Sequence, residues 1–208
     1  MTHSLHRQGS IESLKHDYVI YARCSRGINL EGAAPKVRRI VEIVFDEGPT
    51  NAGDSPHHAS MADGRLTREA ALEFQENTRG FICCFSEREK VKRVLARLKE
   101  EDLGISIVVS GLIDEVMSMA KEIGLRPHTI NLSLGIWGKR ELLPSSEVLE
   151  FTTMCGHGLV AAGLVEKAIA EMKAGTKTAE EAARMVGIPC ICGIVNLERA
   201  KTLLKNLA

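Results

Sequence analysis

The sequence has few aromatic residues, no excess of charge and no long apolar run. Its 27 basic and 27 acidic side chains cancel, so we expect no general affinity for nucleic acid or anionic lipid. An aromatic content of 4% also argues against a base-stacking surface. No apolar stretch approaches the roughly 18 residues that span a bilayer, and the first residues do not resemble a secretory signal. We therefore expect a cytoplasmic protein that binds neither nucleic acid nor membrane.

The sequence also lacks the short motifs of the common enzyme classes. It contains no Gly-x-Gly-x-x-Gly, no Walker loop, no nucleophile elbow and no His-Glu-x-x-His. It has no internal repeat and no low-complexity segment. A hydrophobic content of 44% with 26% charged residues is typical of a globular domain. The function must therefore be sought in clusters of reactive residues.

The first two thirds of the chain alternate between strand-like and helix-like segments. Strands are expected at 17–24, 80–85, 104–109 and 128–134, with helices from about 35, at 67–77, at 86–101 and from 110, and a long loop at 48–65. Such strand–helix–strand successions imply right-handed βαβ units. We therefore predict an α/β fold, a two- or three-layer sandwich with a mostly parallel or mixed sheet. A free sheet edge would make a homodimer possible.

From about residue 140 onward the pattern becomes helical. Helices are expected from Ser145 or Ser146 toward residue 155, at 159–173, at 178–187 and at 196–204. We therefore divide the chain into an α/β domain at 1–139 and a helical subdomain at 140–208, packed as one unit.

Two short clusters in this helical part concentrate reactive side chains. The first is Cys155-Gly-His-Gly158 and the second is Pro189-Cys-Ile-Cys-Gly193. We place Cys155 at a helix start, where free backbone N–H groups and the helix dipole favour the thiolate. Closely spaced cysteines in a reducing compartment more often serve metals or catalysis than disulfides.

Glycine residues beside these cysteines strengthen that interpretation. Gly156, Gly158 and Gly193 remove side chains where a bulky centre needs close backbone approach, so we assign them to cofactor binding. The side chains of an extended Cys-x-Cys point to opposite sides, so a turn must bring Cys190 and Cys192 together. A cysteine that only fills a core needs no such neighbours.

Three interpretations of the clusters remain open. In the first, Cys155, Cys190 and Cys192 hold a [4Fe–4S] cluster, and because four thiolates are usual, one iron stays open for a substrate. In the second, the same sulfurs and His157 bind zinc. In the third, the cysteines are small buried hydrophobes or form a redox pair.

The zinc interpretation has a partial resemblance to the nucleobase deaminases. Those enzymes place a zinc ligand and a glutamate at one helix start and a Pro-Cys-x-x-Cys at another. Here His157 stands where the glutamate would be, and the second cluster is Cys-x-Cys. The general acid/base is missing, so we predict no deaminase activity.

The sequence thus predicts an iron–sulfur protein, most simply a non-redox enzyme of the lyase, dehydratase or desulfurase type acting on a small anionic metabolite. The open iron would act as a Lewis acid and His157 would move a proton. Arg7, with His6, would hold a substrate carboxylate, unless the N-terminus is a disordered tail. His57-His58 belong to a solvated loop or to a lid. The alternatives are a zinc-stabilised binding or structural module, and a cluster or sulfur carrier that serves a partner protein.

Overall fold

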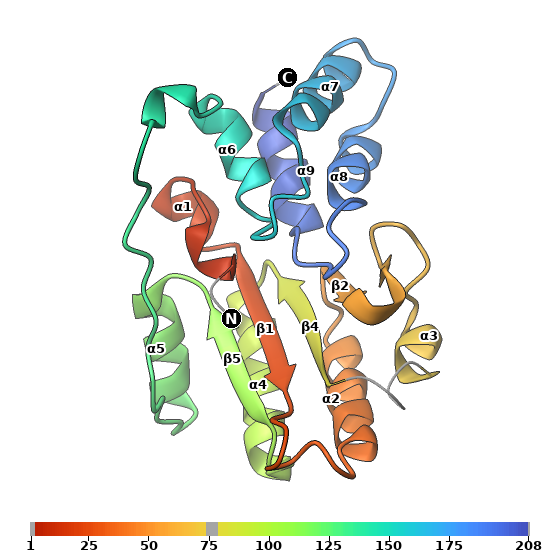
Figure 1. Cartoon of the computed structure of the whole chain (residues 1–208), viewed down its shortest axis with the longest axis vertical. Coiled ribbons are helices and arrows are strands. Elements are labelled where there is room, and N and C mark those ends of the chain that lie inside the picture. Colours follow the sequence, from red (N-terminus) through yellow and green to blue (C-terminus); the bar gives the residue numbers. More distant parts are fainter. Residues whose placement is uncertain (1–2, 74–78, 208) are drawn as a thin grey trace.

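The computed structural model describes residues 3–73 and 79–207, and its centre is one five-stranded sheet (Figure 1). The strands are β1 (Tyr18–Arg23), β2 (Asn51–Asp54), β3 (Ala59–Ser60), β4 (Gly80–Phe85) and β5 (Ser106–Ser110). Their order is β3-β2-β4-β1-β5, and each neighbouring pair is antiparallel.

Helices connect and follow these strands. The α-helices are α1 (Ile11–Leu14), α2 (Ala34–Asp46), α3 (Arg68–Glu73), α4 (Arg88–Glu101), α5 (Ile113–Glu122), α6 (Ser146–Thr152), α7 (Ala162–Lys173), α8 (Ala179–Gly187) and α9 (Leu197–Asn206). Short 3-10 helices are η1 (His3–His6), η2 (Ser55–His57) and η4 (Arg140–Leu142). No helix within the described ranges is long and apolar enough to cross a membrane.

The predicted mostly parallel or mixed sheet with βαβ units is wrong. Strands β1 and β2 are joined through α2 and do run in the same direction, but β4 lies between them and is antiparallel to both. In the same way β1 separates β4 from β5. This is the split arrangement of a ferredoxin-like β-α-β-β-α-β chain, with β3 added at one edge. A local sequence pattern does not show which strand is inserted between two others.

Two segments differ from the sequence predictions. The expected strand at 128–134 is extended but belongs to no sheet, so that prediction is wrong. The expected loop at 48–65 contains β2 and β3, which extend the sheet beyond β4. Of the helix expected at 67–77, α3 covers residues 68–73, and positions 74–77 lie outside the described residues.

Helix caps in the C-terminal third agree better with the sequence. Ser145 and Asn196 accept backbone hydrogen bonds at the starts of α6 and α9. Thr178 and Glu181 form the expected capping box of α8. The helix predicted at 159–173 begins only at Ala162. This shift changes the position of Cys155, as described below.

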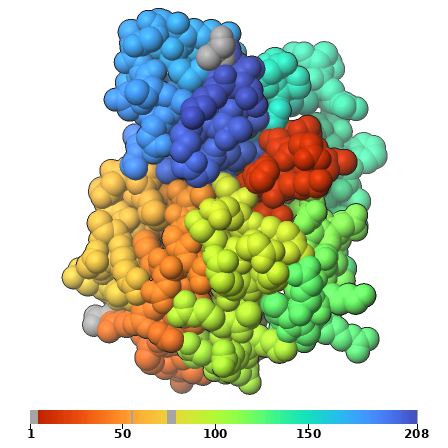
Figure 2. Space-filling view, turned by 180° about the vertical axis from the view of Figure 1, so that it is seen from behind, coloured from red at the N-terminus to blue at the C-terminus, as the bar shows by residue number. Residues whose placement is uncertain are grey.

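The sheet is covered on both faces by different structures. On one face, alternate strand residues such as Ile20 and Phe85 pack with α2 and α4 in one apolar cluster. On the other face, Val19, Ile82 and Cys84 pack with α6 to α9 in a second cluster. From behind, α9 and α1 lie against each other above the sheet (Figure 2). Both cysteine motifs belong to the second cluster.

Candidate functional site

The two cysteine motifs are the loops that follow α6 and α8. After α6, backbone hydrogen bonds from Met154 to Phe151 and from Cys155 to Thr152 make a tight turn. Cys155 therefore follows a helix end and precedes α7 by seven residues, so its predicted place at a helix start is wrong. Hydrogen bonds from the backbones of Leu159 and His157 nevertheless reach its sulfur.

The expected turn between Cys190 and Cys192 is present. The Gly193 N–H donates to the Cys190 carbonyl at 2.9 Å and closes the turn, and Gly193 leaves it with a left-handed φ of +61° that favours glycine. As a result the Sγ atoms of Cys190 and Cys192 lie 3.6 Å apart. All six cysteines of the chain are free thiols.

The three thiols form a hydrogen-bonded series. All three thiols are at most 3% exposed, and the Cys190 and Cys192 sulfurs are close enough for either one to donate to the other. The hydrogen bond with Cys190 and burial raise the pKa of Cys155 well above its usual value. The hydrogen bond with Cys155 lowers the pKa of Cys190, but the hydrogen bond with Cys192 and burial outweigh it and raise this pKa to about 11. The hydrogen bond with Cys190 lowers the pKa of Cys192.

His157 lies at the solvent side of this series. Its Nδ1 is 3.6 Å from the Cys192 Sγ, and the residue is exposed. The contacts are therefore sequential, from Cys155 to Cys190, Cys192 and His157. Within the described ranges, no three such side chains already form a set that could hold a metal ion. The four donors are neighbours, but they need a further adjustment to surround one ion.

A close backbone contact fixes the second loop against the sheet. A Cβ on Gly193 would lie 2.1 Å from the Ala52 carbonyl carbon of β2, and a Cβ on Gly53 would lie 2.3 Å from the Cys192 carbonyl carbon. Only glycines permit this approach. Nothing lies within 4 Å of a Cβ built on Gly158, which has a φ of +68°. The cofactor role predicted for Gly156, Gly158 and Gly193 stays a prediction, and Gly193 has a packing role as well.

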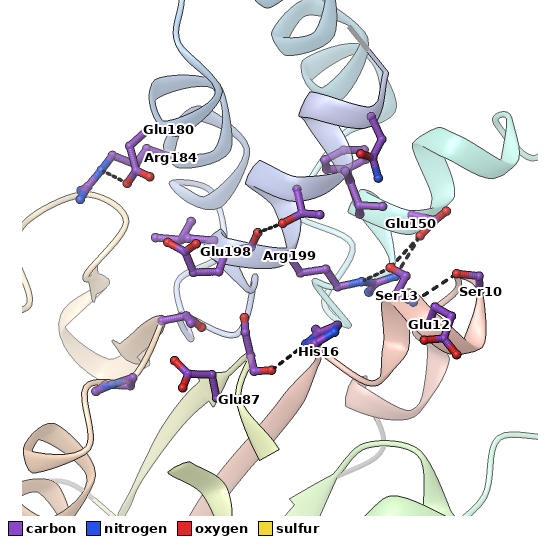
Figure 3. Close-up of a pocket in the computed structure, with 18 of the residues that line it drawn as sticks. Ser10, Glu12, Ser13, His16, Glu87, Glu150, Glu180, Arg184, Glu198 and Arg199 are labelled. Carbon is purple, nitrogen blue, oxygen red and sulfur yellow. Dashed lines mark hydrogen bonds and ion pairs between the residues drawn. The ribbon is translucent and has the colours of Figure 1, made fainter. Parts of the chain in front are cut away.

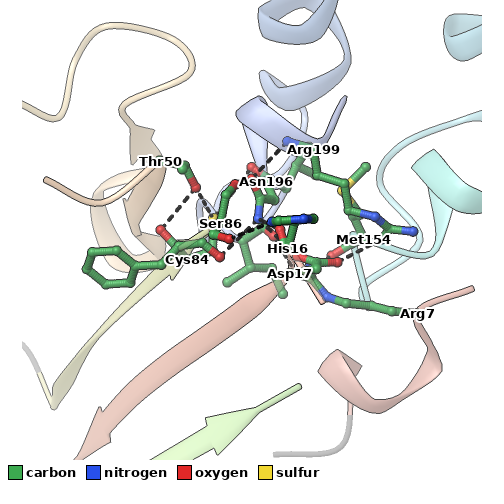
Figure 4. A network of polar contacts seen from close by, with 12 residues as sticks. Arg7, His16, Asp17, Thr50, Cys84, Ser86, Met154, Asn196 and Arg199 are labelled. Atoms are coloured by element: carbon green, nitrogen blue, oxygen red, sulfur yellow. Dashed lines mark hydrogen bonds and ion pairs between the residues drawn. The ribbon is translucent and has the colours of Figure 1, made fainter. Parts of the chain in front are cut away.

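Arg7 links both cysteine loops to the N-terminal segment (Figure 4). Its guanidinium donates to the carbonyls of Met154 and Ile194, one beside each motif, and pairs with Asp17. Its positive charge also interacts with Cys84 and Cys190. The side chain is only 7% exposed. Carboxylate binding by Arg7 stays a prediction, but its Nη donors are occupied by protein groups.

A buried charged network continues from Arg7. Asp17, whose side chain is fully buried, also accepts from Arg199 at 2.7 Å, and Arg199 contacts Glu150 at 3.1 Å. Sequence reasoning missed this network, because partners more than 180 positions apart leave no local pattern. A further cysteine, Cys84 of β4, lies beside the second motif and donates toward the Gly193 and Val195 carbonyls.

The other predicted residues lie elsewhere. The exposed His6 is 3.5 Å from the Ser133 hydroxyl, and that hydroxyl belongs to the segment after α5, not to either cysteine motif. His57 lies 3.0 Å from Asp54 in η2, after β2. Their predicted catalytic and lid roles stay predictions.

A cleft of about 1000 Å³ lies apart from the cysteines (Figure 3). It lies between α1, α8 and α9 and the loop that precedes α4, and none of its lining residues is a cysteine. Its walls carry charges of both signs, including Glu150, Glu180 and Glu198 with Arg184 and Arg199, and several of these residues pair with one another. Binding of a small anionic metabolite stays a prediction. We therefore base the functional argument on the thiols, whose chemistry is specific.

Comparison with protein families, with curated proteins and with solved structures finds no match to this chain.

Proposed function

We propose that this chain is a metal-binding protein in which Cys155, Cys190, Cys192 and His157 hold one zinc ion. The supporting observation is the pair of 3.6 Å distances, between the two sulfurs of the Cys-x-Cys and between Cys192 and His157. In a tetrahedral site with Zn–S of about 2.3 Å and Zn–N of about 2.0–2.1 Å, sulfur atoms are about 3.8 Å apart and sulfur–nitrogen edges measure about 3.6 Å. Two edges of the proposed site thus already have the required length, and the adjustment that is still needed brings all four donors around one ion.

The role that best suits this site is structural. The thiols are buried, and three cysteines with one histidine is a common closed zinc set. Zinc would tie the loop after α6 to the loop after α8, on the face of the sheet formed by β2 and β4. Binding energy at such a site is folding energy, because the unfolded chain has no preformed site. Since all six cysteines are unpaired, we infer a reducing compartment such as the cytoplasm.

An iron–sulfur enzyme of the lyase type is the second candidate. The observation that favours it is the exposed His157 beside buried thiols, which could move a proton at an iron that lacks a thiolate. Cluster ligands on different irons lie about 6–7 Å apart, given iron–sulfur bonds near the zinc–thiolate length. Cys190 and Cys192 would have to separate for this role, so zinc is the better fit.

Metal analysis of protein purified without oxygen tests both candidates. We expect one zinc per chain, lost in Cys190→Ser and retained in Cys24→Ala. Cys24 is the matched control because it is also buried but belongs to the other apolar cluster. A result of about four irons and four sulfides per chain, in place of zinc, would favour the second candidate. A folded wild-type protein without zinc, iron or sulfide would contradict both.

A further inference from the structure

The segment that follows α5 is extended but unpaired. Residues 127–138 run along the outer edge of the molecule, from the end of α5 toward η4 (Figure 1). In the described part of the chain, no backbone–backbone hydrogen bond joins residues 128–134 to another segment. The backbone of this segment is thus open to pairing with a partner strand, except at Leu134, whose carbonyl accepts from the Trp137 indole at 3.1 Å.

The apolar side chains of this segment are exposed. Ile130, Leu132 and Leu134 alternate along one face and are 51%, 67% and 85% exposed, and none belongs to either apolar cluster. Trp137, slightly farther along, is 83% exposed. Scattered apolar residues on a surface are ordinary, but four within eight positions of one unpaired strand indicate an interaction surface. The alternating apolar residues that predicted a strand here therefore form a surface that a single copy of the chain leaves exposed.

The residues of this strand are complementary to themselves. Positions 127–138 contain no charged side chain if histidine is neutral, so two copies can approach without repulsion. In an antiparallel pair centred on Asn131, Ile130 faces Leu132 of the second copy. On the opposite face, Thr129 faces Ser133, so their hydroxyls can pair once they exchange their present contacts with His128 and His6. Gly135, with a φ of +90°, ends the regular strand after Leu134.

We propose that residues 128–134 pair with the same residues of a second copy of this chain, antiparallel about a twofold axis at Asn131. The contact is isologous, because each residue meets its counterpart in the reverse order. About half of the seven residues of each copy gain backbone hydrogen bonds, because hydrogen-bonded and non-hydrogen-bonded pairs alternate in an antiparallel ribbon. Six large apolar side chains gather on one face of the ribbon. The occupant of this surface is therefore a second copy, and the protein is a homodimer.

Cysteine cross-linking tests the pairing register. Asn131→Cys places two thiols opposite each other, where Cα atoms of antiparallel pairs are about 4.5–5.5 Å apart, within the range of a disulfide. Thr129→Cys is the matched control on the same strand face, because its two copies are four residues out of register, about 14 Å apart. Mild oxidation should give a covalent dimer of Asn131→Cys only, with wild type as the blank. Equal cross-linking of both variants, or of neither, would overturn the proposal.

Sedimentation of the uncross-linked protein tests the dimer itself. Leu132→Glu should raise the dissociation constant on the order of 100-fold, because it puts a carboxylate against an apolar neighbour. The circular dichroism spectrum should not change, because Leu132 packs in neither apolar cluster. Leu132→Ile should stay dimeric. A monomeric wild type, or a Leu132→Glu protein that dimerises as tightly as wild type, contradicts the proposal.

Discussion

The two faces of the sheet are stabilised in different ways. The face covered by α2 and α4 contains a core of aliphatic and aromatic side chains such as Ile40 and Phe85. The face covered by α6 to α9 combines an apolar core with four of the six cysteines. Beside this second core lies the buried network of Arg7, Asp17 and Arg199.

This difference explains why function is expected on only one face. Apolar packing tolerates exchange between residues of similar volume. A buried charge or a series of thiols tolerates few substitutions, because the loss of one partner leaves another polar group unpaired. On the second face, the identity and position of the buried charged and thiol groups are therefore more restricted than apolar packing alone would require.

The largest effect is expected where the second cysteine loop meets β2. Gly193→Ala should destabilise the protein by more than about 4 kcal/mol, because its Cβ would overlap the Ala52 backbone. Gly158→Ala is the matched control, since it has a similar positive φ but open space around it, and it should cost only about 1–2 kcal/mol. Denaturant unfolding measures both. Equal costs would mean that the close approach to β2 does not position the loop.

A somewhat smaller effect is expected in the charged network. Asp17→Ala removes the carboxylate that two buried guanidinium groups share, leaves Arg7 without an acidic partner and should cost about 3–5 kcal/mol. Asp46 also pairs with two arginines, Arg68 and Arg97, but its side chain is 35% exposed. Asp46→Ala should therefore cost less than about 1 kcal/mol. If thermal unfolding shows the same loss for both variants, burial does not distinguish the networks.

Zinc affinity should depend on pH. The pKa values of metal-free Cys155 and Cys190 are raised, that of Cys190 to about 11, so zinc must displace at least two protons at neutral pH. A rise in pH removes these competing protons and strengthens binding, by about 100-fold per unit between pH 6 and 8. Competition with a chromophoric chelator measures this slope. An affinity that is constant over this range would exclude thiolate ligands.

The smallest effect is expected at a helix cap away from the thiols. Thr178→Ala removes the capping box of α8 and should destabilise the protein by about 1 kcal/mol. Zinc content per folded chain should stay at one, because Thr178 contacts none of the four donors. Calorimetry and metal analysis of the same sample separate the two effects. A loss of zinc without a loss of stability would show that α8 positions the site directly.

Local patterns in the sequence predicted local structure well. The strand at 80–85 is β4, and the side chains of Ser145, Thr178 and Asn196 cap helices as expected. The spacing of Ser86 and Glu89 favours a capping box, but α4 instead follows Glu87, which makes no side-chain cap. Short-range propensities decide such features, so an error usually moves an element by only a few residues.

Contacts between segments that are distant in the sequence could not be predicted from it. Nothing near β1 indicates that β4 pairs with it, and nothing near Arg7 indicates that it reaches Met154 and Ile194. The site was predictable in part, because two motifs with glycines were visible and do meet. The contacts among the sulfurs and the packing of Gly193 on β2 could be seen only in the folded structure.

X-ray absorption at the zinc edge tests the central proposal most directly, because it counts ligands by type and distance. For protein purified without oxygen, the account predicts three sulfur atoms at about 2.3 Å and one nitrogen at about 2.0–2.1 Å. In His157→Ala the nitrogen contribution from imidazole should disappear while the three sulfurs remain. Fewer than three sulfur ligands in the wild-type protein would contradict the proposal that Cys155, Cys190 and Cys192 hold the metal together.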